Sequence, residues 1–221
     1  MDIKQKIAQW IPTHVSPKFV VFVYGVLDRL IYIKKSVRKE NRLVNDQVLN
    51  SDSSPYKQGY IENQSEWKNV KFGRSTMAFS GCEIMAVYNV LYALDRGKGT
   101  KLIGELIEEF EKSGADLKGM IGSSPRSIRR HLLKHGIKSS IVWKEEDIDP
   151  DCTLAVATVY NDKKTLYSQI HTIAFTKDEN GFRAHNARSR QKYYPTLREA
   201  INGVGSDPKM ICAILIDKIY R

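Results

Sequence analysis

The sequence Ser80-Gly81-Cys82-Glu83 leads directly into an apolar-periodic stretch over residues 84–94, and this combination decides the fold. Apolar side chains recur there at the i, i+3, i+4 and i+7 spacing of a helix that packs along one face, at Ile84, Val87, Tyr88, Leu91 and Leu94. Ser80 and Glu83 have the spacing of a capping box, which predicts that the helix begins here. We therefore expect a buried helix that carries Cys82 in its first turn.

A cysteine in the first turn of a helix lies where a thiol becomes reactive. Unpaired backbone N–H groups and the positive end of the helix dipole stabilise a thiolate, so the position predicts a lowered pKa for Cys82. The alternative is that Cys82 is a small buried hydrophobic residue near a helix end. A catalytic role also requires a base and a group that orients this base, both supplied from elsewhere in the chain.

A β-hairpin in the C-terminal part of the chain is expected to supply both groups. Residues 170–175 are rich in β-branched and aromatic side chains, residues 178–181 read as a turn, and residues 182–186 return as the second strand. His171 opens the first strand and Asn186 closes the second, so antiparallel pairing brings them to the same end of the ladder. A side-chain amide oxygen beside an imidazole fixes its orientation and tautomer, as the third member of a catalytic triad does.

The other histidines are weaker candidates for the base. His14 lies in the N-terminal segment, and His131 and His135 lie in or at the end of a basic helix. His185 adjoins Asn186 but should point to the opposite face of its strand. His171 is therefore the expected base.

These motifs follow the order found in a known family. Residues 73–216 resemble the papain-like cysteine peptidases related to the double-glycine leader peptidases that process bacteriocins. The matching motifs are Gly81-Cys82-Glu83-Ile84-Met85-Ala86, Gly122-Ser123-Ser124-Pro125 with the helix after it, the strand with His171, the turn at Gly181, the strand ending in Asn186 and a short helix over residues 196–201. The resemblance implies Cys82 as nucleophile, His171 as general base and acid, and Asn186 as the orienting residue.

One position departs from the family pattern. The family places a glutamine six residues before the nucleophile to donate to the oxyanion, and this chain has Thr76 there. Loss of one oxyanion donor costs about 10²–10³ in rate unless another group replaces it. We take the hydroxyl of Thr76 as the candidate replacement, which implies a slow or narrowly specialised enzyme, or a relative that has lost activity.

Composition limits the remaining classes of function. With 221 residues, of which 42% are hydrophobic, the chain can bury one sizeable core. Its three cysteines include no Cys-x-x-Cys pair, so neither a disulfide framework nor a metal site is expected, and no cofactor motif occurs. Cys152 and Cys212 adjoin or occupy expected strands and read as buried. The net charge is +10, but the sequence contains no nucleic-acid-binding motif. The expected partner is therefore a peptide or protein substrate and not a nucleic acid.

The N-terminal part of the chain is strongly basic. The first 44 residues hold nine Lys and Arg against three Asp and Glu. An amphipathic helix is expected over residues 3–11 and a more apolar one over residues 19–33, which Asp28 and Arg29 make too charged to span a bilayer. This segment either docks on the main domain or lies on an anionic membrane surface, and the sequence also permits an inhibitory role. The first residues lack a signal peptide, so a cytoplasmic location is expected, with membrane association as the alternative.

Together these features predict an α+β, papain-like fold, in which the cysteine helix packs on an antiparallel sheet. The expected division is a helical extension over residues 1–44, a linker or surface loop over 45–66 and a peptidase domain over 67–221. Two further helices (103–110 and 125–135) and five strands (138–143, 154–160, 170–175, 182–186 and 210–216) are predicted. The expected activity is amide hydrolysis through an acyl-thioester on Cys82. An acyltransferase or transglutaminase-like enzyme with the same triad, and a weakened papain-like binding module, are the alternatives.

Overall fold

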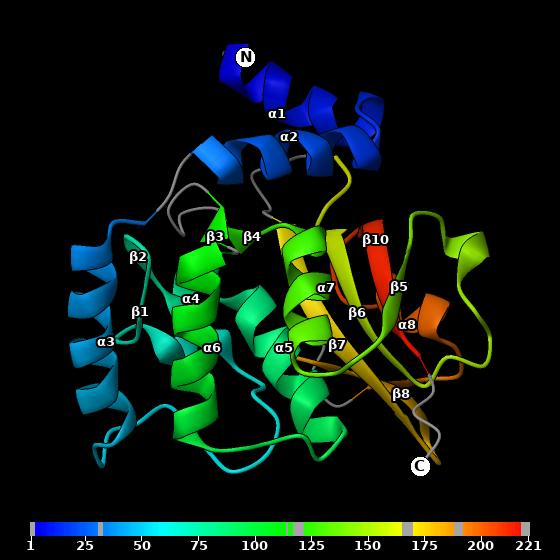
Figure 1. Ribbon diagram of the computed structural model, residues 1–221. Helices are drawn as coiled ribbons and strands as arrows, with labels where there is room; N and C mark the ends of the chain where they lie inside the picture. Colours follow the sequence, from blue (N-terminus) through cyan, green and yellow to red (C-terminus); the bar gives the residue numbers. More distant parts are fainter. Residues whose placement is uncertain are drawn as a thin grey trace.

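The computed structural model describes residues 3–30, 33–113, 115–116, 122–164, 170–187 and 192–217. The elements are α1 (Ile3–His14), α2 (Pro17–Leu30), α3 (Lys35–Leu49), η1 (Gln64–Trp67), β1 (Lys71–Phe72), β2 (Ser75–Thr76), α4 (Met77–Ser80), α5 (Cys82–Ala93), α6 (Thr100–Ser113), β3 (Ala115–Asp116), β4 (Gly122–Ser123), α7 (Pro125–Lys134), β5 (Ser139–Val142), η3 (Glu145–Asp147), β6 (Leu154–Tyr160), β7 (Ile170–Asp178), β8 (Gly181–His185), β9 (Tyr193–Tyr194), α8 (Leu197–Asn202) and β10 (Lys209–Ile216). Helices α5, α6 and α7 lie on one face of an antiparallel sheet, and α8 lies on the other (Figure 1).

The main sheet has six strands in the order β5-β10-β6-β7-β8-β9, and each neighbouring pair is antiparallel. All five predicted strands are present, and β6 has the predicted bounds. The predicted hairpin is formed by β7 and β8, which pair from Ala174↔His185 to Asp178↔Gly181. The α+β class is therefore confirmed.

The sheet separates two hydrophobic layers. On one face, α5, α6 and α7 pack against inward side chains of the strands such as Val156, Ala174 and Ile214. On the other face, Ala157, Ile173 and Phe175 pack against α8. Residues 82–91 of α5 are all buried, so this helix is central, as its apolar periodicity predicted.

The start of α5 differs from the predicted capping box. The short helix α4 ends at Ser80, whose hydroxyl points back to the Thr76 carbonyl at 3.5 Å instead of capping α5. Gly81 is the N-cap residue, so Cys82 is the first helical residue. A side chain does not fit at position 81, since a Cβ there would lie 2.6 Å from Met77 Sδ and 2.7 Å from the Met77 carbonyl oxygen. The chain turns between two helices at this point, and only glycine allows the approach.

The close packing of Gly81 against Met77 leads to a prediction about stability. We expect Gly81→Ala to lower the free energy of unfolding by about 1–3 kcal/mol, because the new methyl group overpacks against Met77. Gly104→Ala, inside α6, is the matched control: its Cβ would meet only Leu49 Cδ1 at 3.8 Å, so it should stabilise by about 0.5–1 kcal/mol. Urea unfolding of both variants measures the difference, and equal stability of the two would refute the packing argument.

Helix α3 belongs to the main body of the protein. Asn41 is buried and donates to the Gly73 carbonyl (2.8 Å) and to the Glu111 carboxylate (2.6 Å). Asn45 is also buried and pairs with the backbone of Lys71 as donor (2.9 Å) and acceptor (2.7 Å). The predicted boundary between residues 44 and 45 therefore falls inside a helix that is fixed to the β1–β2 hairpin.

The linker or surface loop predicted over residues 45–66 is observed only in part, since residues 50–63 contain no helix or strand but the two ends are helical. Its first residues complete α3, and Ile61 is buried, with its backbone N–H and carbonyl both bound by the side chain of Asn89 in α5 (2.8 and 3.0 Å). The polar composition, rich in Ser, Asn and Asp, predicted a linker or surface loop. Ile61 is nevertheless held against the central helix by the side chain of Asn89.

Helices α1 and α2 lie beside one another at one end of the molecule (Figure 1). Val21 of α2 is buried against Tyr160 and Ile211, and the Lys209 ammonium donates to the Pro12 carbonyl at 2.7 Å. The apolar helix expected over residues 19–33 is observed to Leu30, and residues 31 and 32 lie outside the described part. In the described residues, no helix is both long and apolar enough to cross a membrane.

Candidate functional site

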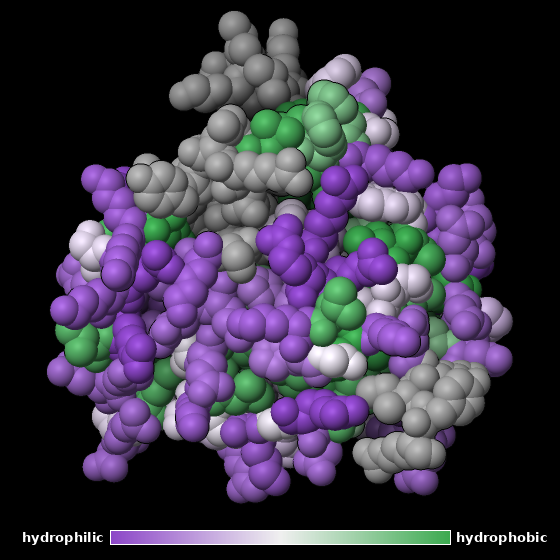
Figure 2. All heavy atoms as spheres, viewed as in Figure 1, coloured by the Kyte–Doolittle hydropathy of each residue, from purple (hydrophilic) through white to green (hydrophobic). Residues whose placement is uncertain are grey.

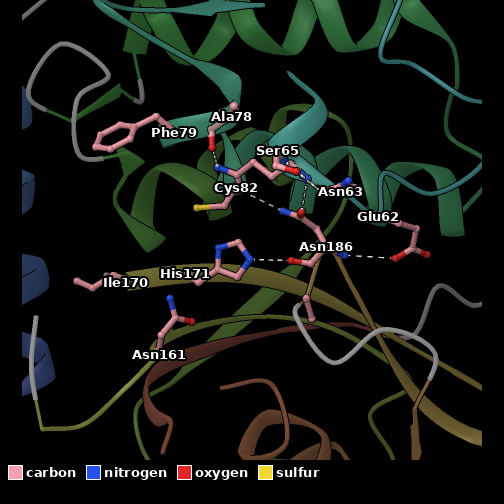
Figure 3. Close-up of a pocket in the computed structure, with 12 residues that line it drawn as sticks. Glu62, Asn63, Ser65, Ala78, Phe79, Cys82, Asn161, Ile170, His171 and Asn186 are labelled. Carbon is pink, nitrogen blue, oxygen red and sulfur yellow. Dashed lines mark hydrogen bonds between the residues drawn. The ribbon is translucent and has the colours of Figure 1, made fainter. Parts of the chain in front are cut away.

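The N-terminus of α5 and the end of the β7–β8 hairpin border one pocket of about 340 Å³ (Figure 3). Cys82, His171 and Asn186 all line it, as the sequence predicted. The remaining lining residues come from residues 62–65, the short helix α4 and the ends of strands: Glu62, Asn63, Gln64, Ser65, Ala78, Phe79, Asn161, Ile170 and Ala187. The pocket therefore joins parts of the chain that are far apart in sequence.

Cys82 and His171 face the same pocket. The Cys82 thiol projects from the first turn of α5 toward the imidazole of His171 (Figure 3). Thr172 follows His171 in β7 and forms hydrogen bonds with the Cys82 sulfur through its backbone and its hydroxyl. Both bonds lower the pKa of Cys82. Cys82 is only 6% exposed, and it lines the pocket.

The backbone of Asn186 orients His171. The ring nitrogen Nε2 of His171 lies 2.6 Å from the Asn186 carbonyl oxygen, which can only accept, so Nε2 carries the proton. In the neutral imidazole, Nδ1 is then the proton acceptor. The sequence assigned this orienting role to the side-chain amide of Asn186, and the structure assigns it to the carbonyl. Asn186 has φ +63°, a left-handed conformation that asparagine tolerates, and the ladder of β8 ends there.

The side chain of Asn186 forms a reciprocal pair with Gln64. Its Oδ1 accepts from the Gln64 backbone N–H at 2.8 Å, and its Nδ2 donates to the Gln64 side-chain oxygen at 3.1 Å. The paired oxygen and nitrogen fix the orientation of both amide groups. We call these two hydrogen bonds the clasp. The clasp ties residues 62–65, which line the pocket, to the β7–β8 hairpin.

Gln64 is a site residue that the sequence analysis missed. Its Nε2 donates one hydrogen to the Ala78 carbonyl at 3.1 Å, and an amide nitrogen carries two. The second N–H has no acceptor within the described residues. Gln64 lies 18 positions before Cys82 in the sequence and outside the six-residue spacing of the family, so no spacing signal identified it.

Thr76, the predicted oxyanion donor, is placed elsewhere. It pairs with Lys71 in the β1–β2 hairpin and precedes α4, and it is absent from the described lining of the pocket. The inserted helix α4 separates it from the start of α5. Asn161 was also missed: it directly follows β6 and lies near His171 in the pocket (Figure 3).

The pKa of Cys82 is opposite in direction to the prediction. Burial raises it well above the usual value, and the charge of the neighbouring Glu83 raises it further, while hydrogen bonding by Thr172 acts weakly in the opposite direction. Glu83 is itself buried in the first turn of α5. Desolvation of the thiolate is the largest cause of this shift. Cys82 rests as a neutral thiol, and a reaction would need a base to remove its proton.

Glu62 anchors the pocket wall to β8. Its carboxylate accepts from Arg183 (2.8 Å), His185 Nδ1 (2.9 Å) and the Asn186 backbone N–H (3.3 Å). Burial opposes ionisation, but the hydrogen bond from His185 and the charges of His185 and Arg183 outweigh it, so the pKa of Glu62 is lowered. His185 is also stacked on Tyr60, with ring centroids 3.8 Å apart. These contacts hold residues 60–64 against the hairpin.

The other cysteines do not belong to the site. Cys152 and Cys212 are buried, as predicted, and burial raises the pKa of both thiols, that of Cys212 to about 12. Among the described residues, no group of three or more His, Cys, Asp or Glu side chains is arranged to hold a metal ion.

The fold and the pocket define the chain as an α+β protein with a cysteine and an oriented histidine in one pocket. No known family model, curated protein or solved structure matches it.

Proposed function

We propose that the chain is a cysteine peptidase with a papain-like fold, which hydrolyses an amide bond of a peptide or small protein. The observation that carries the proposal is the convergence of Cys82, at the first position of a helix, and His171, oriented through Nε2, on one pocket. A helix lying on an antiparallel sheet, with the thiol at its N-terminus and the imidazole on a strand, fits the resemblance seen in the sequence.

In this proposal His171 moves the proton in each step. Nδ1 accepts the Cys82 proton as the sulfur attacks the scissile carbonyl, and the imidazolium then gives that proton to the leaving amine. The acyl group remains on sulfur as a thioester. His171 next takes a proton from water, whose oxygen attacks the thioester and releases a carboxylic acid and the thiol. The raised pKa of Cys82 makes this base necessary.

The oxyanion would be bound by two N–H donors. The backbone N–H of Cys82 belongs to the first turn of α5 and has no partner within the helix. The second donor would be Gln64 Nε2, whose position is fixed by Ala78 and by the clasp with Asn186. Gln64 therefore takes the role that the sequence analysis gave to Thr76. A complete donor set favours an enzyme over a binding module.

The pocket is lined by both apolar and polar residues, a combination that suits a peptide substrate. Phe79, which is 59% exposed, Ala78 and Ile170 offer apolar contact for side chains. Asn63 and Gln64 add polar side chains to the lining of the pocket. Glu62 is already paired with Arg183 and His185, so the described lining carries little uncompensated charge.

A peptidyl chloromethyl ketone tests the proposal directly. We expect it to alkylate Cys82 with loss of chloride, giving one mass adduct that peptide mapping places on that residue. The adduct should be absent from Cys82→Ala and retained in Cys152→Ala, which is the matched control because Cys152 is also buried.

Two results would contradict the proposal. One is a folded protein in which all three cysteines are labelled at similar rates. The other is no labelling of Cys82 by a panel of peptidyl chloromethyl ketones while iodoacetamide still reaches the thiol. The second result would favour a binding pocket without catalysis.

A further inference from the structure

Helix α2 carries an apolar face that no described residue covers. Phe19, Phe22, Val23 and Val26 follow the i, i+3, i+4, i+7 spacing and are 57%, 53%, 39% and 41% exposed. Val21, on the opposite side of the helix, is 2% exposed and packs on the main body. The helix is thus docked by one face and open on the other. We call the four exposed residues the α2 stripe.

The α2 stripe is a concentrated patch and not a scatter of single side chains. It holds four of the nine large hydrophobic residues exposed in the described part of the chain, and Trp10 of α1 adds a fifth at 54%. Figure 2 shows a small group of apolar side chains at this end of the molecule, above a largely polar surface. Continuous exposed apolar patches of this kind mark interaction surfaces.

Basic residues follow the α2 stripe in the sequence. Lys34, Lys35 and Lys39, at the start of α3, are exposed. Within the described residues, no carboxylate lies at ion-pair distance from these three side chains. The first 44 residues together carry nine Lys and Arg against three Asp and Glu. An exposed apolar helix face is therefore followed along the chain by a cationic segment.

We infer that α1 and α2 dock the protein on an anionic membrane surface, with the α2 stripe in the headgroup region and the lysines against lipid phosphates. A helix with aromatic and aliphatic residues on one face and nearby lysines binds such surfaces. The charge argues against a second copy as the occupant, because two chains of net charge +10 repel one another. The inference does not depend on the proposed activity.

The buried side of α2 lies near the pocket. Ile170, which lines the pocket, also packs on the cluster that holds Val21 of α2. Figure 3 shows Phe79 and Ile170 on the side of the pocket nearer to the N-terminal helices. The α2 stripe lies on the opposite side of the helix from Val21, so a membrane bound to it would be on the far side of α2 from the main body.

Vesicle sedimentation of the full chain tests the inference. We expect binding to vesicles of phosphatidylcholine with 30% phosphatidylglycerol, release as salt rises, and much weaker binding to phosphatidylcholine alone. The double variant Phe19→Ser/Phe22→Ser should lose most of the binding. Leu133→Ser is the matched control, because Leu133 is 61% exposed on α7 and lies outside the patch.

A second pair of variants tests the electrostatic contribution of the lysines to vesicle binding. Lys34→Gln/Lys35→Gln should weaken binding to anionic vesicles about 30-fold, from roughly a fivefold effect for each lysine. Lys98→Gln/Lys101→Gln, two exposed lysines near the start of α6, should leave it unchanged. The inference is overturned if anionic vesicles are not bound, if neutral vesicles are bound equally, or if light scattering shows a dimer that Phe19→Ser/Phe22→Ser dissociates.

Discussion

Replacing His171 with alanine is expected to slow the alkylation of Cys82 by a peptidyl chloromethyl ketone by about 10²–10⁴-fold at neutral pH, the usual contribution of a positioned general base. Burial and the charge of Glu83 raise the pKa of Cys82, so the thiol remains protonated without the imidazole. The measurement is the rate of adduct formation with the peptidyl chloromethyl ketone. The deficit should narrow as pH rises, because the thiol then ionises without a protein base.

His135→Ala is the control for this experiment. His135 is half-buried at the end of α7, with its Nε2 3.3 Å from the Glu109 carboxylate, and it does not line the described pocket. Its loss should leave the rate unchanged. If His171→Ala reacts as fast as the unchanged protein at every pH, Cys82 is not activated by His171 and the proposed pair is wrong.

Replacing Gln64 with alanine is expected to lower turnover by about 10²–10³-fold, the cost of one oxyanion donor. The backbone N–H of Gln64 remains to bind Asn186 Oδ1, so part of the clasp survives the change. Kinetics with a chromogenic peptide substrate would place the loss in kcat more than in KM, because the donor acts on the charge that develops in the transition state.

Thr76 provides the direct comparison. Thr76→Ala should leave turnover close to that of the unchanged protein, and Thr76→Gln should not raise it, because position 76 is outside the described pocket. A large loss in Thr76→Ala together with a small loss in Gln64→Ala would reverse the assignment. Urea unfolding of both variants separates a catalytic loss from a loss of folded protein.

The sequence predicted the parts of the site that depend on local patterns. Helical periodicity after Cys82 and the alternation and turn of the β7–β8 hairpin are set by neighbouring residues. The hairpin then fixes by geometry that His171 and Asn186 lie at one end. These short-range rules were sufficient to bring the three residues to a common pocket.

The remaining features depend on contacts between distant segments. Gln64 and Glu62 lie in a polar stretch whose composition gives no sign that Asn186 and Arg183 will bind it. The sign of the Cys82 pKa shift was missed because burial is a property of the folded chain, whereas the helix dipole can be read from the sequence. The capping box failed because close packing between Gly81 and Met77 ends one helix and starts another.

The clasp between Gln64 and Asn186 also sets when the site can exist during synthesis. Its partners are 122 residues apart, so the ends of a long stretch of chain must meet before the pocket closes. A growing chain that has left the ribosome only as far as α7 holds Cys82 but neither His171 nor the carbonyl that orients it. Such an intermediate carries a thiol without a base. Under the proposed function, the nascent enzyme is harmless to its surroundings until almost the whole chain has been made.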